Sequence, residues 1–179
     1  MDAKLLKENA KCIKPTALLV GIAGIVFSVF KMIPFDLGIA TIAAMALIVG
    51  LVYAFNLADK FAKAAKEEEV KALKQLKLAA ILYFSALAID NMLLVGGYLA
   101  AICVIVAAVF LMLAAKQLKL AHPEFKLIFI AAIIGIVAGA FEIIGAIPFI
   151  GIIFNVIGRL ADIAVFVLIL VAGIKLAKA

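Results

Sequence analysis

Apolar residues along this chain are grouped in long runs, and short polar segments separate the runs. One helix needs about 20 mostly apolar residues to cross the hydrocarbon core of a bilayer, so each run of that length predicts a membrane span. The runs predict spans at about 16–33, 35–57, 78–95, 97–115, 125–146 and 149–173. We therefore expect an all-α integral membrane protein with a six-transmembrane-helix bundle. The spans pair into three tandem helical hairpins, at about 16–57, 78–115 and 125–174.

The run 78–115 is too long for one span, so it must contain a turn. Gly96-Gly97 is a turn signal, and we place the boundary between the third and fourth spans there. Asp90-Asn91 also interrupts the run and is an alternative corner.

Two polar segments are also expected to be helical. Asp2 to Lys14 predicts a short surface helix, with Pro15 in the first turn of the first span, where a missing amide proton costs nothing. The charged segment 58–77 is rich in Ala, Lys, Glu and Leu and predicts a helical connector. It either prolongs the flanking spans beyond the membrane or lies at the membrane surface. The whole chain, 1–179, is expected to form a single transmembrane domain.

A proline corner occurs twice, as Met32-Ile33-Pro34-Phe35 and Ala146-Ile147-Pro148-Phe149. Several apolar residues before the two corners match at the same offset, which favours an internal repeat of helical hairpins. A weaker alignment adds the middle hairpin to the repeat. In that alignment Ser28, Asp90 and Glu142 hold equivalent positions, each six residues before its corner.

The composition excludes a water-soluble globule, because 69% of the residues are hydrophobic and the mean hydropathy is +1.35. A net charge of +6 would suit nucleic acid, but most of the 17 basic residues lie in four polar segments separated by pairs of spans. The positive-inside rule produces that distribution, so we expect no nucleic-acid partner. We predict a multi-pass protein of the cytoplasmic (inner) membrane with both termini in the cytoplasm.

The expected partner is the lipid bilayer itself. The Lys-rich cytoplasmic face is expected to attract anionic lipid headgroups. A second copy of the chain or another membrane protein stays open as a further partner.

The last hairpin carries four polar side chains inside its apolar runs, Glu142, Asn155, Arg159 and Asp162. The last three are spaced four and three residues apart, so they share one face of the sixth span. Arg159 is expected about 16 Å below the outer end of that span, with Glu142 and Asp162 as its candidate partners. Asp90 is a further carboxylate within an apolar run.

Ionisable residues inside a membrane are candidates for a substrate or ion pathway, and we name Glu142, Arg159, Asp162, Asn155 and Asp90 as that set. The first hypothesis is a transporter or channel for a proton, an ion or a small solute, with these residues around a water-accessible cavity. The alternative is a non-transporting scaffold, assembly or regulatory subunit in a dry bundle. Its buried charges would then be structural and set the helix register.

Two polar residues beside the first corner receive a local interpretation. Lys31 and Asp36 are expected to lie at the outer interface and to anchor the corner there.

The chain shows no catalytic or cofactor-binding signature. Its only serines, Ser28 and Ser85, have no nucleophile-elbow context, and no phosphate-binding glycine loop is present. His122 is the only histidine and has no His or Cys partner at metal-ligand spacing. We therefore expect no enzyme activity, no cofactor and no metal.

Several generic features are similar to those of the small six-span membrane proteins of the acid-resistance HdeD type. They are Gly21-xx-Gly24, the corners at Pro34 and Pro148, and the overall length. The resemblance implies three short hairpins with a Gly-rich first helix, and it carries over no functional residue.

Overall fold

The computed structural model describes residues 3–33, 38–92, 96–120, 122–145, 147 and 151–178, and the regular structure in those residues is helical. The helices are α1 (Ala3–Lys31), α2 (Ile39–Ala64), α3 (Glu67–Met92), α4 (Gly96–Leu118), α5 (Phe125–Gly145) and α6 (Gly151–Leu176). Each contains a stretch long and apolar enough to cross a membrane. The prediction of an all-helical chain with six such helices is confirmed, and it indicates a multi-pass integral membrane protein.

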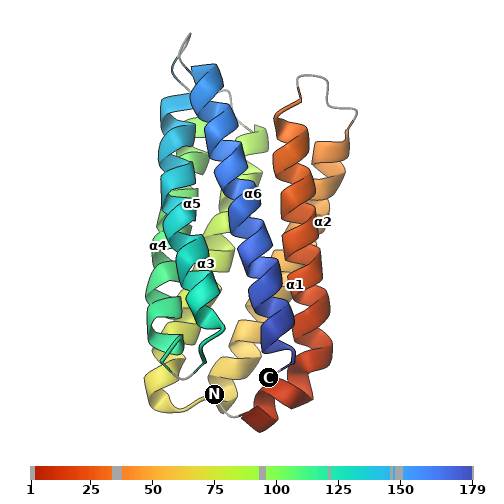
Figure 1. The fold of residues 1–179 in the computed structure, drawn as a ribbon, viewed down its shortest axis with the longest axis vertical. Helices are drawn as coiled ribbons and strands as arrows, with labels where there is room; N and C mark the ends of the chain where they lie inside the picture. The colour runs from red at the N-terminus through yellow and green to blue at the C-terminus, as the bar shows by residue number, and fades with distance from the viewer. Residues whose placement is uncertain are drawn as a thin grey trace.

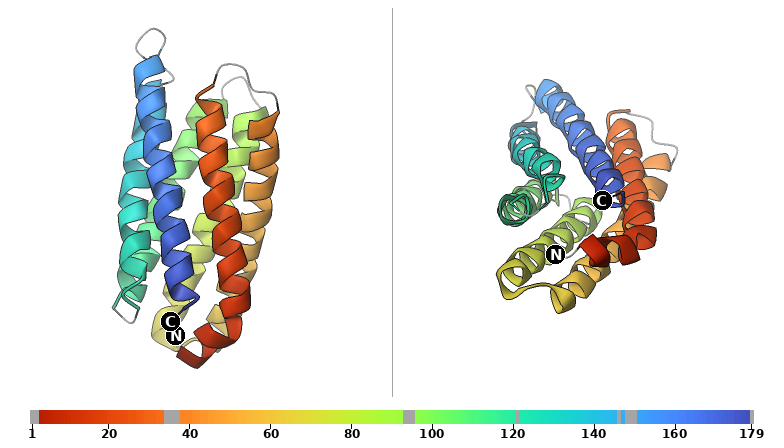
Figure 2. Two further views of the ribbon diagram at one scale, coloured as in Figure 1. Left: turned by 45° about the vertical axis from the view of Figure 1, so that its right-hand side comes forward. Right: turned by 60° about the horizontal axis from the view of Figure 1, so that its bottom comes forward.

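The six helices form a closed ring. Each helix packs against its neighbours in the sequence, and α6 packs against α1 to complete the circle. Within the described residues, helices that are not neighbours in this ring make no direct backbone contact. Figure 1 shows the long helices running side by side with both termini at one end, and Figure 2 shows the ring obliquely from that end. The interior of the ring is therefore not crossed by any of the six helices.

The amino-terminal segment differs from the prediction. No separate surface helix precedes the first span, because α1 runs without a break from Ala3 to Lys31 and includes Pro15. A proline inside a helix removes one backbone hydrogen bond and bends the helix, and Figure 1 shows α1 bending near its amino-terminal end. The Ala, Lys, Leu and Glu residues before Pro15 favour the helix strongly enough for it to continue.

Two other boundaries are sharper in the structure. The segment 58–77 prolongs α2 and α3, which are separated only at Ala65 and Lys66. Gly96-Gly97 does not form the turn between the third and fourth spans, because both glycines already belong to the first turn of α4. Asp90-Asn91 is not the corner either, since it lies within α3. The first turn of a helix tolerates these glycines because its backbone N–H groups have no partner in the helix.

The proline corners fall on residues that are partly outside the described ranges. Pro34, Phe35, Ala146, Pro148 and Phe149 lie outside them, and Asp36 does too. The internal repeat and its corners therefore stay predictions.

Close packing between α1 and α6 closes the ring. A Cβ atom on Gly24 would overlap the ring of Phe166, and one on Gly21 would lie 2.6 Å from Cβ of Leu170. In the opposite direction, a Cβ on Gly173 of α6 would overlap Ala17. Glycines at these positions let two membrane helices approach closely, which is the main source of attraction between helices in lipid.

The end of the ring that holds the termini is filled by apolar side chains. One buried cluster receives residues from every helix: Ile13, Phe61, Ala72, Leu73, Leu118, Phe125 and Leu176. We call this cluster the apolar plug. Beside it, the carboxylate of Asp59 on α2 pairs with Nζ of Lys77 on α3 at 2.7 Å and with Nζ of Lys63 at 3.2 Å. This end of the ring is therefore filled by packed apolar side chains, and partly exposed ion pairs connect α2 with α3 there.

The seam between α1 and α6 can be tested with two glycine variants. Gly24→Ala places a methyl group against Phe166 and should lower the free energy of unfolding by about 1–3 kcal/mol, because overpacked cores lose about that much. The matched control is Gly97→Ala, whose Cβ meets nothing within 4 Å. It should be neutral or stabilising by up to about 1 kcal/mol. Circular dichroism in mixed micelles measures both, since the chain has no Trp. Equal effects of the two variants would contradict the close α1–α6 seam.

Candidate functional site: a charged cavity inside the helix ring

A polar cavity of about 280 Å³ lies inside the ring, toward the end opposite the termini. Five of the six helices contribute to its wall, and α2 does not. Its polar lining consists of Lys31, Tyr83, Asp90, Asn155, Glu142, Arg159 and Asp162. The other lining side chains are apolar, so the charges are concentrated in one compartment of an otherwise apolar ring.

Arg159 of α6 holds the centre of this cavity. Its Nη1 atom lies 2.8 Å from Oε1 of Glu142 on α5 and 3.4 Å from Oδ2 of Asp162, one turn further along α6. The predicted partners of Arg159 are therefore both present. The pairing is incomplete, however: Nε of Arg159 is buried and has no hydrogen-bond partner among the described residues. A buried donor of this kind is costly, so it is a ready contact for a bound molecule or water.

Gly158 brings Glu142 and Arg159 together. A Cβ at Gly158 would lie 3.3 Å from both the backbone oxygen of Ala138 and Cγ of Glu142. Room at this glycine therefore serves the close approach of α5 and its glutamate. The ion pair depends on that approach, because Glu142 lies on the neighbouring helix.

Lys31 has a partner that the sequence analysis did not predict. Its Nζ pairs with Oδ2 of Asp90 at 3.2 Å, and both side chains line the cavity. Lys31 ends α1 and Asp90 lies in α3, so this pair connects two helices that are not neighbours in the ring. It therefore lies across the mouth of the cavity.

The three carboxylates of the cavity become more buried with depth. The exposed fraction is 22% for the side chain of Asp90, 13% for Glu142 and 7% for Asp162. Asp162 lies about 16 Å along α6 from Gly151, at 1.5 Å per residue. That depth is near the middle of a hydrocarbon core of about 30 Å. The cavity thus leads from a partly exposed mouth to a buried carboxylate.

An aromatic ring lies between the two basic side chains. Nζ of Lys31 lies 5.7 Å from the ring centroid of Phe27, and Cζ of Arg159 lies 5.8 Å from the same centroid. Cations are attracted to the face of an aromatic ring at such distances. Phe27 therefore offers the cavity a surface that accepts positive charge.

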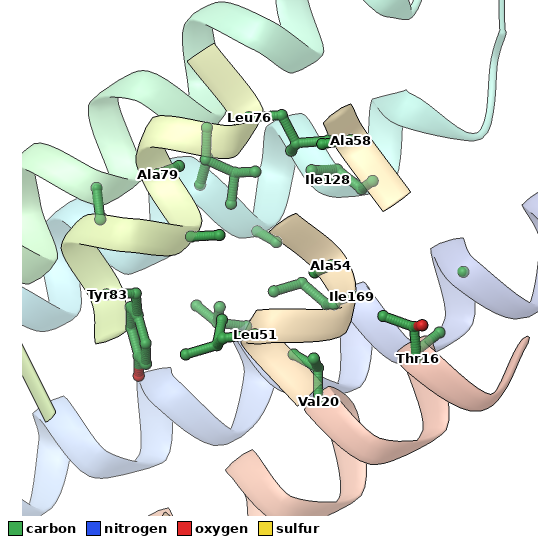
Figure 3. Close-up of a pocket in the computed structure, with 18 of the residues that line it drawn as sticks. Thr16, Val20, Leu51, Ala54, Ala58, Leu76, Ala79, Tyr83, Ile128 and Ile169 are labelled. Carbon is green, nitrogen blue, oxygen red and sulfur yellow. The ribbon is translucent and has the colours of Figure 1, made fainter. Parts of the chain in front are cut away.

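A second cavity lies directly beyond the first. It measures about 220 Å³ and has an apolar lining drawn from all six helices (Figure 3). Tyr83, Val104 and Asp162 line both cavities, so the two meet at these three side chains. At its other end the apolar cavity reaches the plug residues Phe61 and Leu176.

The structure brings all five predicted pathway residues to one place: Glu142, Arg159, Asp162, Asn155 and Asp90 all line the polar cavity. Of the three positions that the repeat alignment made equivalent, Asp90 and Glu142 meet there, while Ser28 is fully buried and is not part of the lining.

Sequence reasoning missed Lys31, Phe27 and Tyr83. Tyr83 offered a signal, since a phenol in an apolar span is polar at one end. Phe27 offered none, because it is one aromatic residue among the 13 Phe of an apolar chain.

The described residues hold no group of three or more His, Cys, Asp or Glu that could bind a metal ion. Comparison of the chain with models of known families, with curated proteins and with solved structures finds no match. The arguments about function therefore rest on the geometry of the cavity.

The buried ion pairs can be tested by breaking and then rebalancing them. Arg159→Gln leaves Glu142 and Asp162 without their cation and should lower the free energy of unfolding by about 3–5 kcal/mol. Adding Glu142→Gln to that variant should recover part of the loss, because one unpaired buried charge is removed. Lys77→Gln, at a partly exposed pair, is the control and should cost about 1 kcal/mol or less. Denaturation in mixed micelles measures these three variants and the single Glu142→Gln, and a purely additive double variant would contradict the pairing.

Proposed function

We propose that this chain is a small multi-pass transporter or channel that takes up a proton, an ion or a small solute in the polar cavity of its helix ring. The observation that carries the proposal is the cavity itself: about 280 Å³ lined by five charged side chains, at a depth where charge is costly. The roles in the proposal are specific. Asp90 and Lys31 form the mouth, Glu142 and Arg159 the wall, and Asp162 the deepest contact for the cargo.

The balance of charge favours a cationic cargo. Two basic side chains, Lys31 and Arg159, face three carboxylates, those of Asp90, Glu142 and Asp162. One negative charge is left over when all five are ionised, and a proton or another cation would neutralise it. A low-polarity surrounding strengthens that attraction relative to water.

The alternative, a non-transporting scaffold or assembly subunit, is favoured by one observation. Each cation of the cavity already has a carboxylate partner, Glu142 and Asp162 for Arg159 and Asp90 for Lys31. Such a network would also serve to fix the register of the helices. The two functions differ in whether water reaches the cavity.

Orientation in the membrane is part of the proposal. We place the end of the ring with both termini in the cytoplasm, in a cytoplasmic (inner) membrane, because most lysines lie at that end. The mouth of the polar cavity would then face the opposite side.

Accessibility of the cavity can be measured by cysteine labelling in a membrane. In a background with Cys12→Ala and Cys103→Ala, single variants Asn155→Cys and Ala100→Cys place a thiol in the cavity lining. Both should react with a membrane-impermeant methanethiosulfonate added from the side opposite the termini. A cationic reagent should react faster than an anionic one by roughly tenfold or more, because negative charge in the cavity concentrates cations.

The control for labelling is Ala138→Cys, on the same helix as Glu142. Ala138 is fully buried and lines neither cavity, so its thiol should stay protected. Protection at all three positions would contradict a water-filled pathway and favour the structural alternative.

A further inference from the structure

We propose that the two cavities form one composite site for an amphiphilic organic cation, whose charged head binds in the polar cavity and whose apolar tail fills the apolar cavity. The inference rests on the proposed function and names the class of its cargo. The observation behind it is the junction: Tyr83, Val104 and Asp162 line both cavities, so a carboxylate lies where head and tail would join.

The polar cavity suits a monovalent cationic head. Its third carboxylate is not matched by a third basic residue in the lining, and the ring of Phe27, which already lies near Lys31 and Arg159, belongs to the same wall. Organic ammonium groups are bound in proteins by carboxylates and aromatic faces of this kind. With all five of these groups ionised, an anionic head would meet an excess of negative charge and is disfavoured.

The apolar cavity suits a tail and little else. Its lining is composed of aliphatic and aromatic side chains, with Thr16, Tyr83 and Asp162 as the exceptions. Along α6 it extends from Asp162 to Leu176, about 21 Å at 1.5 Å per residue. A hydrated ion gains little there, because only these three side chains could replace its water. A cargo that uses both compartments must therefore be polar at one end only.

Size supports a single occupant for both compartments. Ligand pockets usually measure about 300–1,000 Å³, and neither cavity reaches that range alone. Together the volumes of about 280 and 220 Å³ fall within it. At its far end the tail compartment is lined by the plug residues Phe61 and Leu176.

Binding can be measured by isothermal titration of the full chain in lipid nanodiscs, with empty nanodiscs subtracted. Octyltrimethylammonium should bind, tetramethylammonium should bind far more weakly, and octylsulfonate should not bind. Affinity should rise by up to about fourfold for each methylene added between butyl and octyl, because each buried CH₂ contributes about that factor.

Two variants assign the compartments. Asp162→Asn should weaken the binding of octyltrimethylammonium by roughly tenfold or more, because it removes the carboxylate at the junction. Asp162→Glu keeps a carboxylate there and should keep the binding. Ala54→Phe, on the lining labelled in Figure 3, should shorten the tail compartment and remove the gain from butyl to octyl. Ala54→Leu serves if the phenylalanine variant does not fold. The matched control is Ala140→Phe, an exposed position on α5 that lines neither cavity and should bind as the parent does.

The outcomes separate this inference from the proposed function. Equal binding of the cation and the sulfonate, or no effect of Asp162→Asn, would overturn the composite site in favour of a simple apolar chain site. Cysteines in the polar cavity that react with water-soluble reagents, combined with no binding of octyltrimethylammonium, would overturn the amphiphile and leave the pathway standing. Protected cysteines would instead defeat the proposed function.

Discussion

The rest of the structure depends on one constraint: a guanidinium at the depth of Arg159 needs partners, because hydrocarbon supplies none. The partners come from two helices. Asp162 lies one turn away on α6, and Glu142 comes from α5, which approaches α6 closely at Gly158. The same guanidinium faces Phe27 on α1. The charge of Arg159 thus contacts residues of three consecutive helices of the ring, α5, α6 and α1.

The hollow interior has a compositional cause. Alanine occurs repeatedly in the lining of the apolar cavity, for example at Ala54, Ala79 and Ala107. A helix face with many small residues usually packs directly against a neighbouring helix, as at Gly21 and Gly24. In a ring of six, small side chains on the inner face cannot all meet a neighbour, so space is left along the axis. Glycine therefore allows neighbouring helices of this ring to pack closely, while alanine leaves space along the axis of the ring.

The helices and the polar set were accessible from the sequence because they depend on local pattern. Run length predicts a span, and the spacing of Asn155, Arg159 and Asp162 places them on one face. The contact between Lys31 and Asp90 could not be predicted, because the two residues are 59 positions apart and their helices are not adjacent in the ring. Closure by α6 on α1 was equally hidden, since it depends on shape at Gly24 and Phe166. The prediction of a separate helix before Pro15 was wrong for another reason. The tendency of Pro15 to break a helix was outweighed by the helix-favouring residues around it.

Closure of the ring has a consequence for chain order. Since α6 packs on α1 and the two termini lie at the same end of the molecule, the six helices have a cyclic neighbour order in which no helix is first or last (Figure 1). A circularly permuted chain, with the old ends joined by a flexible linker and new ends opened between Ala65 and Lys66, would keep every helix-to-helix contact. The contacts between the helices are thus those of a closed cycle.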